Sequence, residues 1–445
     1  MSSASTSLKV IVVGGGIAGL CTAIGLRRAG HHVHLFERTE TATAFGAGVV
    51  IGYNASKVLT SWGLDYAKYN INPAETFKMV KGDTLEEMMS FPPGLYETLA
   101  GGSRQYYAHR IDLQQALLGL ATDQNAPGTP VTITYSADVA AYDPEEGSIT
   151  LKDGSRYQAD LVVASDGVHS LAPHYLLGGS DAAAAYDISH TGTTIIRFML
   201  PASAILADPQ TAHLISSPGQ FTWFVHPDRN RWLLQYPVRD NSEINYGMYS
   251  RITANEQVTE QVQRFKCNRE SLHRELEGFH PDIGKLADKT SEILPVWKLA
   301  ERPPLPTWSK GRLVVVGDAA HPMLPNQGQG AGMCIEDAGA LSGLFTDMHG
   351  SRIEDITERL DLFFNLRHPR ASAVQLISHC PYFEDAVSIM WAELIKVAKP
   401  QDLPRANDRN NIREWLFAYD VNAEAAKALE ADGRPDLPLG NAIVS

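Results

Sequence analysis

Residues 8–37 read LKVIVVGGGIAGLCTAIGLRRAGHHVHLFE, and this stretch decides the fold. Residues 8–13 are a Val- and Ile-rich run, typical of a buried parallel strand. Residues 17–29 have the composition of a helix that ends at Gly30, and residues 32–37 form the next apolar run. A strand, a helix and a second strand are therefore predicted at the start of the chain, and this order is typical of an α/β fold.

Three glycines at the first junction, Gly14, Gly16 and Gly19, make the pattern GxGxxG. In this pattern the first glycine permits a tight turn, the second lets the backbone approach a pyrophosphate, and the third lets helix and strand pack closely. The phosphate charge then lies on the helix N-terminus. Glu37 ends the second strand, where a carboxylate can accept from both ribose hydroxyls. The stretch predicts a bound dinucleotide, and because the carboxylate would repel a 2′-phosphate, it favours FAD or NAD over NADP.

Two further apolar strands end at glycine junctions later in the chain. Residues 161–170 (LVVASDGVHS) lead into Asp166-Gly167, and residues 312–318 (RLVVVGD) end at Asp318. The second junction continues as AAHPMLPNQGQGAGMCIEDA, in which a glycine-rich run opens a helix. The N-terminal amides of such a helix can bind a negative charge or a flavin carbonyl. Each junction alone could be an ordinary turn, but three together indicate one α/β domain that resumes late in the chain.

The middle of the chain has a different pattern. Strand-like runs at 193–200, 220–227 and 231–238 follow one another with turn-forming residues between them, which predicts an antiparallel sheet in a second domain. Residues 255–278 read as a helix, and from about residue 354 the composition is mainly helical.

Composition excludes several classes of protein. The chain has 445 residues, of which 44 % are hydrophobic and 20 % charged, so it is not mainly disordered. A net charge of −13 argues against general nucleic-acid binding, which needs a basic surface. The four cysteines form no CxxC pair, so we expect no metal site and no disulfide framework, and we predict a reducing, cytoplasmic location. No apolar run is long enough to predict a membrane span.

Together these motifs resemble those of the single-component flavoprotein aromatic hydroxylases (group A flavin monooxygenases), which include para-hydroxybenzoate and salicylate hydroxylases. The order is the family's: GxGxxG, then a DG motif, then a GD motif inside GDAAHPxxPxxGQGxxxxxEDA. The resemblance spans roughly residues 8–380 and points to the salicylate-hydroxylase-like branch, including fungal enzymes of natural-product metabolism. It implies a Rossmann-like FAD-binding domain of the para-hydroxybenzoate-hydroxylase type, an inserted antiparallel β-sheet for the substrate, and a helical C-terminal segment.

The expected domains are discontinuous in sequence. The FAD-binding domain is assigned to 1–75, 101–185 and 300–375, the substrate-binding sheet to 76–100 and 186–299, and the C-terminal helical segment to 376–445.

The resemblance implies roles for residues near the dinucleotide. Glu37 would bind the adenosine ribose. The GAG of 46–48, with Ala47 and Gly48, would run alongside the flavin. Arg110 matches the family arginine that approaches the FAD phosphates and ribityl chain; an ordinary arginine at a helix start is the alternative.

The DG and GD motifs complete the implied cofactor site. Asp166 belongs to the DG motif, which in the family serves both FAD and nicotinamide binding, and Asp318 would bind the ribityl chain. Pro325 occupies the place of a family proline near the reacting face of the flavin. The chain departs from the DGxxSxxR pattern, because Pro173 stands at the arginine position. The loop whose amides would face the isoalloxazine contains Gly328, Gly330 and Ala331.

The implied activity is that of an FAD-dependent monooxygenase. NAD(P)H would act as a transient co-substrate, and a C4a-hydroperoxyflavin would hydroxylate a phenolic or other electron-rich aromatic substrate, in natural-product metabolism or aromatic catabolism. Expected partners are a small aromatic molecule and O₂, with no nucleic acid, and the chain is expected to be a monomer or a homodimer. A flavoenzyme of the same fold could instead carry out epoxidation, oxidative decarboxylation or dehydrogenation. A non-catalytic carrier is a remote alternative.

Two residues of the predicted sheet are candidates for contact with the substrate. Period-two alternation places Arg197 on the same face as Ile195 and Met199, and an arginine on an apolar strand face usually has an anionic partner. We hypothesise that Arg197 anchors a substrate phenolate or carboxylate, or stabilises the peroxide; a surface arginine or a structural ion pair is the alternative. Tyr236 matches the YPxR segment of the family and is a candidate hydrogen-bond donor to substrate, with a core tyrosine as the alternative.

Overall fold

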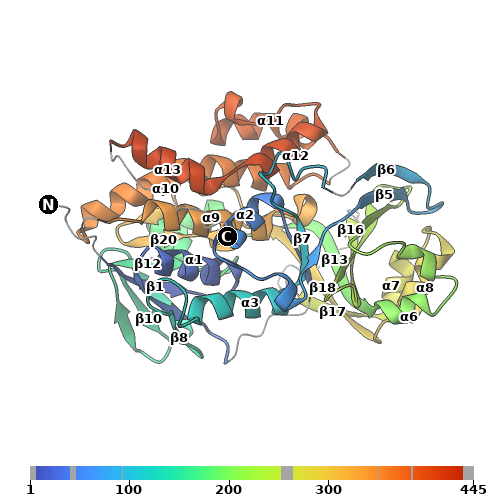
Figure 1. Cartoon of the computed structure of the whole chain (residues 1–445), viewed down its shortest axis with the longest axis horizontal. Coiled ribbons are helices and arrows are strands. Elements are labelled where there is room, and N and C mark those ends of the chain that lie inside the picture. Colours follow the sequence, from blue (N-terminus) through green and yellow to red (C-terminus); the bar gives the residue numbers. More distant parts are fainter. Residues whose placement is uncertain are drawn as a thin grey trace.

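The computed structural model has two large sheets side by side, with a layer of C-terminal helices along one edge (Figure 1). It describes residues 7–40, 47–92, 94–251, 264–348, 350–381 and 384–433. Residue 46 of the predicted GAG lies outside the described residues, and so do residues 255–263 of the predicted helix.

The predicted strand–helix–strand unit is present as β1 (Lys9–Val13), α1 (Ile17–Arg28) and β2 (His32–Phe36). These strands belong to a six-stranded sheet in the order β19-β20-β12-β1-β2-β8. All neighbours are parallel except β19 and β20. The remaining strands are β8 (Thr132–Thr134), β12 (Leu161–Ala164), β19 (Ser309–Lys310) and β20 (Leu313–Val315).

The three apolar runs of the sequence are therefore adjacent strands. Val13 pairs with Ala164, and Ala164 pairs with Val315, so β1, β12 and β20 end side by side. Because parallel strands present their carboxyl ends at one edge, all three glycine junctions meet there. Helix α9 (Gly330–Leu344) packs closely on α1, where a Cβ on Gly25 would lie 2.9 Å from the Ala338 carbonyl oxygen.

The second sheet has eight strands in the order β17-β18-β13-β16-β15-β14-β5-β6. The predicted antiparallel arrangement holds for every neighbouring pair except β14 and β5, which are parallel. The strands are β5 (Phe77–Lys81), β6 (Glu87–Phe91), β13 (Ser189–Pro201), β14 (Phe221–Val225), β15 (Arg231–Val238), β16 (Glu243–Arg251), β17 (Arg264–Asn268) and β18 (Ile293–Glu301).

The two faces of this sheet have different environments. Alternate residues of β13, such as Ile196 and Phe198, pack against α6 (Ala202–Leu206), α7 (Arg269–Glu275) and α8 (Pro281–Asp288) on the outer face. Ile195 packs with Trp223 and Trp232 on the opposite, inner face, which is also the face of Arg197. The predicted alternation along β13 is thus the one observed.

The helix predicted for 255–278 is wrong in its described part. Residues Arg264–Asn268 form β17, which pairs with β18, and only Arg269–Glu275 is helical. A free sheet edge accepts a strand of suitable length whatever its local helical preference, so tertiary pairing overrides propensity here.

Smaller elements complete the fold. One three-stranded sheet contains β9 (Val139–Asp143), β10 (Ser148–Leu151) and β11 (Arg156–Gln158), and another contains β3 (Gly48–Ile51), β4 (Asn72–Pro73) and β7 (Tyr106–His109). The other helices before residue 353 are α2 (Tyr53–Ser61), α3 (Arg110–Thr122), α4 (Ala172–Leu176) and α5 (Ser180–Ala183).

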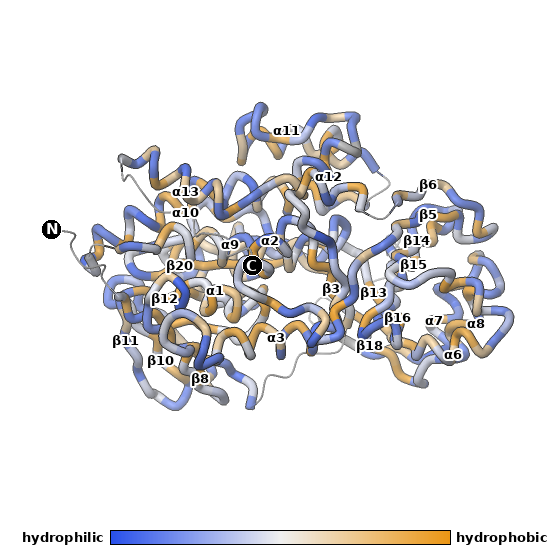
Figure 2. The backbone as a smooth tube through the Cα atoms, viewed as in Figure 1, coloured by the Kyte–Doolittle hydropathy of each residue, from blue (hydrophilic) through white to orange (hydrophobic). Residues whose placement is uncertain are grey.

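The predicted helical C-terminal region is confirmed. It consists of α10 (Ile353–Ile377), α11 (Ala386–Val397), α12 (Arg409–Ala418) and α13 (Val421–Ala431). Apolar segments gather where α1, α2 and α9 lie together, whereas many outer turns are hydrophilic (Figure 2). Among the described residues, no helix combines the length and apolar content that a membrane crossing needs. The domain boundaries stay a prediction.

Candidate functional site

A cavity of about 1100 Å³ runs from the carboxyl edge of the six-stranded sheet to the inner face of the eight-stranded sheet. Small-molecule and cofactor sites usually measure about 300–1,000 Å³, so this volume can hold a large ligand. Most candidate residues from the sequence line it: Gly14, Gly16, Glu37, Gly48, Arg110, Asp166, Arg197, Tyr236, Asp318, Pro325, Gly328, Gly330 and Ala331. Ala47 instead lines a smaller adjoining cavity of about 190 Å³, which Arg110, Arg197 and Asp318 also line.

The three motif glycines have the geometry that the pattern predicts. Gly14 has φ +102°, which favours glycine, and a Cβ there would meet the Ser165 carbonyl oxygen at 2.7 Å. A Cβ on Gly19 would lie 1.8 Å from the Gly14 oxygen, so Gly19 permits the close packing of helix and turn rather than lining the cavity. Gly16 has no protein atom near its missing Cβ and opens onto the cavity.

The Glu37 carboxylate is held in place by backbone and side-chain donors. The Gly15 N–H donates to its Oε2 at 2.5 Å, and the Thr39 N–H and hydroxyl both donate to its Oε1 at 2.9 Å. These contacts fix the carboxylate at the end of β2 beside the glycine turn, where it faces the cavity. A carboxylate can accept about four hydrogen bonds, so it retains capacity for a hydroxyl of a ligand.

The two aspartates of the later junctions differ in environment. Burial raises the pKa of Asp166, against hydrogen bonds from Ser170 and Tyr142 that lower it. Its Oδ2 accepts from the Tyr142 hydroxyl at 2.8 Å, whereas its Oδ1 is buried without a hydrogen-bond partner among the described residues. The Asp318 side chain is exposed to the cavity.

A buried arginine links these two junctions. Arg302 donates to the Val168 carbonyl oxygen at 2.9 Å and to the Ala319 carbonyl oxygen at 3.2 Å. Pro173, at the position of the family arginine, is buried in the first turn of α4. The cation between the DG and GD turns therefore comes from residue 302 and not from the DG motif itself.

Two helix N-termini face the cavity. The first N–H groups of a helix have no intrahelical partners, and in α1 and α9 no side chain caps them. The residues at these ends, Gly16, Ile17, Gly330 and Ala331, line the cavity. The positive ends of both helix dipoles and the exposed Arg110 attract an anion such as a pyrophosphate. With the unsatisfied Asp166 oxygen and the open space at Gly16, the residues present fit FAD.

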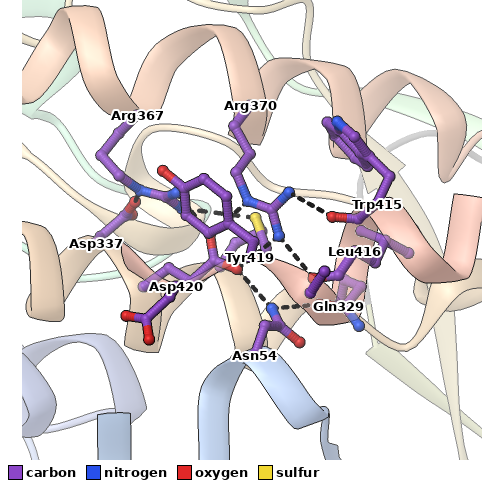
Figure 3. Close-up of polar contacts among 12 residues, drawn as sticks. Asn54, Gln329, Asp337, Arg367, Arg370, Trp415, Leu416, Tyr419 and Asp420 are labelled. Carbon is purple, nitrogen blue, oxygen red and sulfur yellow. Dashed lines mark hydrogen bonds and ion pairs between the residues drawn. The ribbon is translucent and has the colours of Figure 1, made fainter. Parts of the chain in front are cut away.

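A buried charge cluster lies between α9 and α10, and Figure 3 shows part of it. Glu336 and Asp337, the acidic pair of the GD signature, are fully buried. Arg367 contacts Glu336 at 2.6 Å and Asp337 at 3.0 Å, and Arg370 contacts Glu336 at 2.8 Å. Burial alone would raise the pKa of Glu336, but the charges of Arg370 and Arg367 outweigh it and hold the pKa below its usual value.

The cluster also fixes both loops of the GD signature. Asp337 accepts from the Gly317 N–H at 3.0 Å and contacts His321 Nε2 at 2.6 Å, which anchors the GD turn. Asn54 donates to Gln329 Oε1 at 3.1 Å and to the cluster's glutamate at 2.6 Å, which anchors the start of α9. The acidic pair thus positions the backbone that faces the cavity.

Arg197 reaches the cavity from β13. Its Nε is buried and has no hydrogen-bond partner, and no ion pair involves Arg197, among the described residues. Its guanidinium carbon lies 5.4 Å from the centre of the Trp297 ring. A structural ion pair, one alternative from the sequence, is thus not found in the described part of the chain.

Tyr236 is part of an aromatic stack in the cavity wall. It lies 5.4 Å from Phe221, with nearly parallel rings, and 5.0 Å from Tyr107. Burial raises the pKa of Tyr236 well above its usual value, although the charge of Arg197 opposes this shift. The hydroxyl therefore stays protonated near neutral pH and can donate a hydrogen bond. Gly48 lies against this ring, because a Cβ there would fall 2.6 Å from the Tyr236 oxygen.

Several cavity residues have no signal in the sequence. Asn245 lines the wall and accepts from the Gly48 N–H at 2.7 Å, but its contact depends on the pairing of β15 with β16. Arg413 and Phe417 come from α12, far along the chain. A local sequence motif around Asn245, Arg413 or Phe417 could have identified these residues, but the sequence shows no such motif there.

Comparisons with known proteins agree with this geometry. The FAD binding domain family model matches residues 7–375. The chain is 32 % identical over 438 residues to the FAD-dependent monooxygenase cfoG of Aspergillus candidus, with 98 % of each chain covered. It is 27 % identical over 440 residues to hispidin-3-hydroxylase of Neonothopanus nambi, covering 97 % of this chain and 98 % of that protein. A salicylate hydroxylase substrate complex has the same fold, with a TM-score of 0.71, 24 % identity, and coverage of 97 % and 99 %.

The family, the fold class and the cofactor predicted from the motifs are confirmed by these comparisons. The chain belongs to the FAD binding domain family, and it is an FAD-dependent monooxygenase.

Proposed function

We propose that this protein consumes NAD(P)H and O₂ to hydroxylate a phenolic or other electron-rich aromatic substrate, in natural-product metabolism or aromatic catabolism. The names of its relatives support hydroxylation, since they include hispidin-3-hydroxylase, 6-hydroxynicotinate 3-monooxygenase and salicylate hydroxylase. The observation that carries the proposal is the unpaired Arg197, which enters an aromatic-walled cavity shared with the glycine turns. FAD, when bound, supplies the activation of O₂ and the oxygen transfer.

The protein's own side chains bind and activate the substrate. The Arg197 guanidinium binds an ionised oxygen on the ring and so favours the phenolate, whose carbons are more nucleophilic than those of the neutral phenol. The Tyr236 hydroxyl donates a hydrogen bond to a substrate oxygen. The surrounding rings exclude water from the reacting ring.

The cofactor roles rest on placement around the cavity. We assign the pyrophosphate to Gly14, Gly16 and the α1 N-terminus, and the ribose to Glu37. Gly19 supports that turn from behind. The remaining flavin contacts are assigned to Ala47, Gly48, Arg110, Asp166, Asp318, Pro325, Gly328, Gly330 and Ala331.

The domain assignment, cellular location and assembly are further parts of the proposal. We divide the chain into the FAD-binding, substrate-binding and C-terminal parts assigned from the sequence. All four cysteines are free thiols, and three are buried, which supports a reducing compartment such as the cytoplasm. We propose a monomer or a homodimer, which light scattering on the purified protein will distinguish.

The test combines product identification with variants of Arg197. The purified holoenzyme is assayed with phenolic acids, polyketide phenols and alkaloids, following NAD(P)H oxidation and product mass together. A mass gain of one oxygen on the ring supports hydroxylation, while loss of CO₂, an epoxide or a desaturated product identifies the other reactions of this fold.

Arg197→Gln is expected to raise the KM or Kd for substrate by about 10-fold or more, because a charged hydrogen bond is lost. FAD content is expected to stay unchanged, and Arg197→Lys is expected to recover part of the affinity. Arg251→Gln is the matched control, since Arg251 lies on the same sheet but does not line the cavity. Wild-type affinity and turnover in Arg197→Gln would show that the anchor assignment is wrong.

A further inference from the structure

Helix α12 closes one side of the cavity from beyond the segment that the family model matches. Arg413 and Phe417 are four residues apart, so they lie on one face of this helix, and both line the cavity. Phe417 packs on Tyr53 at 4.9 Å and on Tyr96 at 5.3 Å. The C-terminal segment therefore supplies part of the cavity wall, in addition to packing on the rest of the protein.

The Arg413 guanidinium lies among aromatic rings. The side chain is only 7 % exposed, and its guanidinium carbon lies 3.9 Å from the centre of Phe91 and 5.4 Å from that of Phe77. Burial lowers the pKa of Arg413, and the hydroxyl oxygen of Tyr96 opposes this shift. An arginine stays protonated in proteins, so the cavity wall carries a positive charge here.

Contacts at its C-terminal end fix the position of α12. Arg370 donates to the carbonyl oxygens of Trp415 at 3.2 Å and Leu416 at 2.9 Å, and its guanidinium carbon lies 3.8 Å from the Tyr419 ring. Figure 3 shows the Tyr419 ring beside the Arg370 side chain. Lys57 donates to the Ala418 carbonyl oxygen at 3.0 Å. These contacts attach the helix independently of Arg413, whose guanidinium instead lies in the cavity wall beside Phe91 and the Tyr96 hydroxyl.

A continuous aromatic wall connects Arg413 with Arg197. Phe77 lies 5.5 Å from Phe221, and Phe221 stacks on Tyr236 at 5.4 Å. Tyr236 and Arg197 both line the cavity, and the charge of Arg197 acts against the raised pKa of Tyr236. Arg197 and Arg413 are thus joined by a surface of ring faces, which suits a flat aromatic molecule with a negative oxygen at each of two places.

We propose that Arg413 binds a second acidic group of the substrate, so that the cavity selects aromatic compounds with one acidic oxygen for Arg197 and another for Arg413. The inference rests on the proposed function, because it takes Arg197 as the anchor of the hydroxylated ring. Arg413 is a specificity residue that touches the end of the substrate nearest α12. It takes no part in oxygen transfer.

The test measures binding of three related probes to the FAD-loaded enzyme. 4-Hydroxycinnamate carries a phenol and a carboxylate, its methyl ester lacks the carboxylate charge, and cinnamate lacks the phenol. Dissociation constants are read from quenching of tryptophan fluorescence, since Trp223 and Trp297 line the cavity. The acid-to-ester ratio reports on Arg413, and the ratio of 4-hydroxycinnamate to cinnamate reports on Arg197.

The wild type is expected to bind the acid about 10-fold or more tightly than the ester. Arg413→Gln removes this preference while leaving ester affinity within about 2-fold, and Arg413→Lys restores part of it. Arg251→Gln is the control for packing, because Arg251 pairs with Glu384 of the C-terminal segment at 3.2 Å without lining the cavity. It is expected to keep the wild-type ratio.

Two results would overturn the inference. One is a wild type without an acid-over-ester preference, including failure of both probes to bind. The other is an Arg413→Gln enzyme that keeps the preference, or, if that variant does not fold, an Arg413→Lys enzyme with an unaltered ratio. Loss of the phenol preference alone would instead count against Arg197 and the proposed function.

Discussion

The two ends of the cavity are built by different means. At the end formed by the six-stranded sheet, backbone atoms face the ligand space: glycine turns, two helix N-termini and a carboxylate held by N–H groups. At the end formed by the eight-stranded sheet, side chains do so, and they are mainly aromatic rings with two arginines among them. The end at the six-stranded sheet suits one invariant ligand. At the end formed by the eight-stranded sheet, single substitutions of side chains can change which ligand binds.

This difference makes the two ends unequal in their tolerance of change. A methyl group added at Gly14 or Gly19 meets backbone atoms that cannot rotate away. A hydroxyl removed at the side-chain end leaves the ring stack intact. The following experiments test the contrast, starting with the largest expected effect.

Gly19→Ala is expected to abolish FAD binding and to destabilise the fold by more than about 3 kcal/mol, because the new Cβ would lie 1.8 Å from the Gly14 oxygen. Thermal unfolding and the flavin absorbance of the purified protein measure both effects. Gly284→Ala, in α8, is the control: its Cβ would meet nothing within 4 Å, and it is expected to be neutral or slightly stabilising. A yellow, stable Gly19→Ala protein would contradict the close-packing role.

Arg370→Met is expected to cost about 3 kcal/mol, since it removes one of the two cations that neutralise the buried Glu336. The same change releases the carbonyl groups of Trp415 and Leu416 and so loosens α12. Substrate affinity should therefore fall together with stability, while flavin content falls less. Denaturant unfolding and the probe titration measure these quantities. Arg352→Met, an exposed arginine paired with Asp355, should change neither.

Gly16→Ala separates ligand binding from folding at the backbone end. Its Cβ would meet no protein atom and would enter the space expected for the pyrophosphate. We expect a normal melting temperature for the apoprotein but at least about 10-fold weaker FAD binding. Calorimetric titration of the apoprotein with FAD checks this, and unchanged affinity would place the pyrophosphate elsewhere.

Acid should weaken the buried charge cluster of Glu336, Asp337, Arg367 and Arg370, which holds α12 through Arg370. The pKa values of Glu336 and Asp337 lie below their ordinary values of 4.5 and 3.8, chiefly through the neighbouring Arg370 and His321 charges working against burial. Their contribution to stability is therefore complete above those ordinary values and is lost as pH falls through the lower folded-state values. The free energy of unfolding, measured from about pH 7 to about pH 3, should show this loss. In Arg370→Met the fall in unfolding free energy over the same pH range should be smaller.

Tyr236→Phe should have the smallest effect, because the ring stack with Phe221 and Tyr107 is kept. We expect unchanged FAD content and a fall in substrate affinity of about 10-fold or less, the worth of one neutral hydrogen bond. Kd values for a phenolic probe in both proteins provide the measurement. A change in flavin content would mean that the ring supports the backbone end as well.

The same contrast explains how much could be predicted from the sequence. The glycine junctions are local patterns, and Gly14, Gly16 and Gly19 have the geometry that the pattern predicts. Alternation placed Arg197 on the correct face of β13, since a strand's period follows from its backbone.

The rest depended on contacts between distant parts of the chain. The parallel pairing of β14 with β5 joins Phe221 to Phe77 and has no local signal. Residues 264–268 became a strand because β18 offered an edge, against their helical composition. Asn245, Arg413 and Phe417 reach the cavity only through tertiary packing, and single-sequence patterns do not report such contacts.

The pairing of β1 with β12, and of β12 with β20, also governs how the chain is made. β1 leaves the ribosome long before residues 161–164 and 313–315, and at about 5–20 residues per second the wait for β20 lasts tens of seconds. During that time the apolar edges of β1 and β12 are open to mispairing with other chains. The flavin site thus cannot assemble on the nascent N-terminal third alone, and early FAD addition should not speed folding until β20 has emerged.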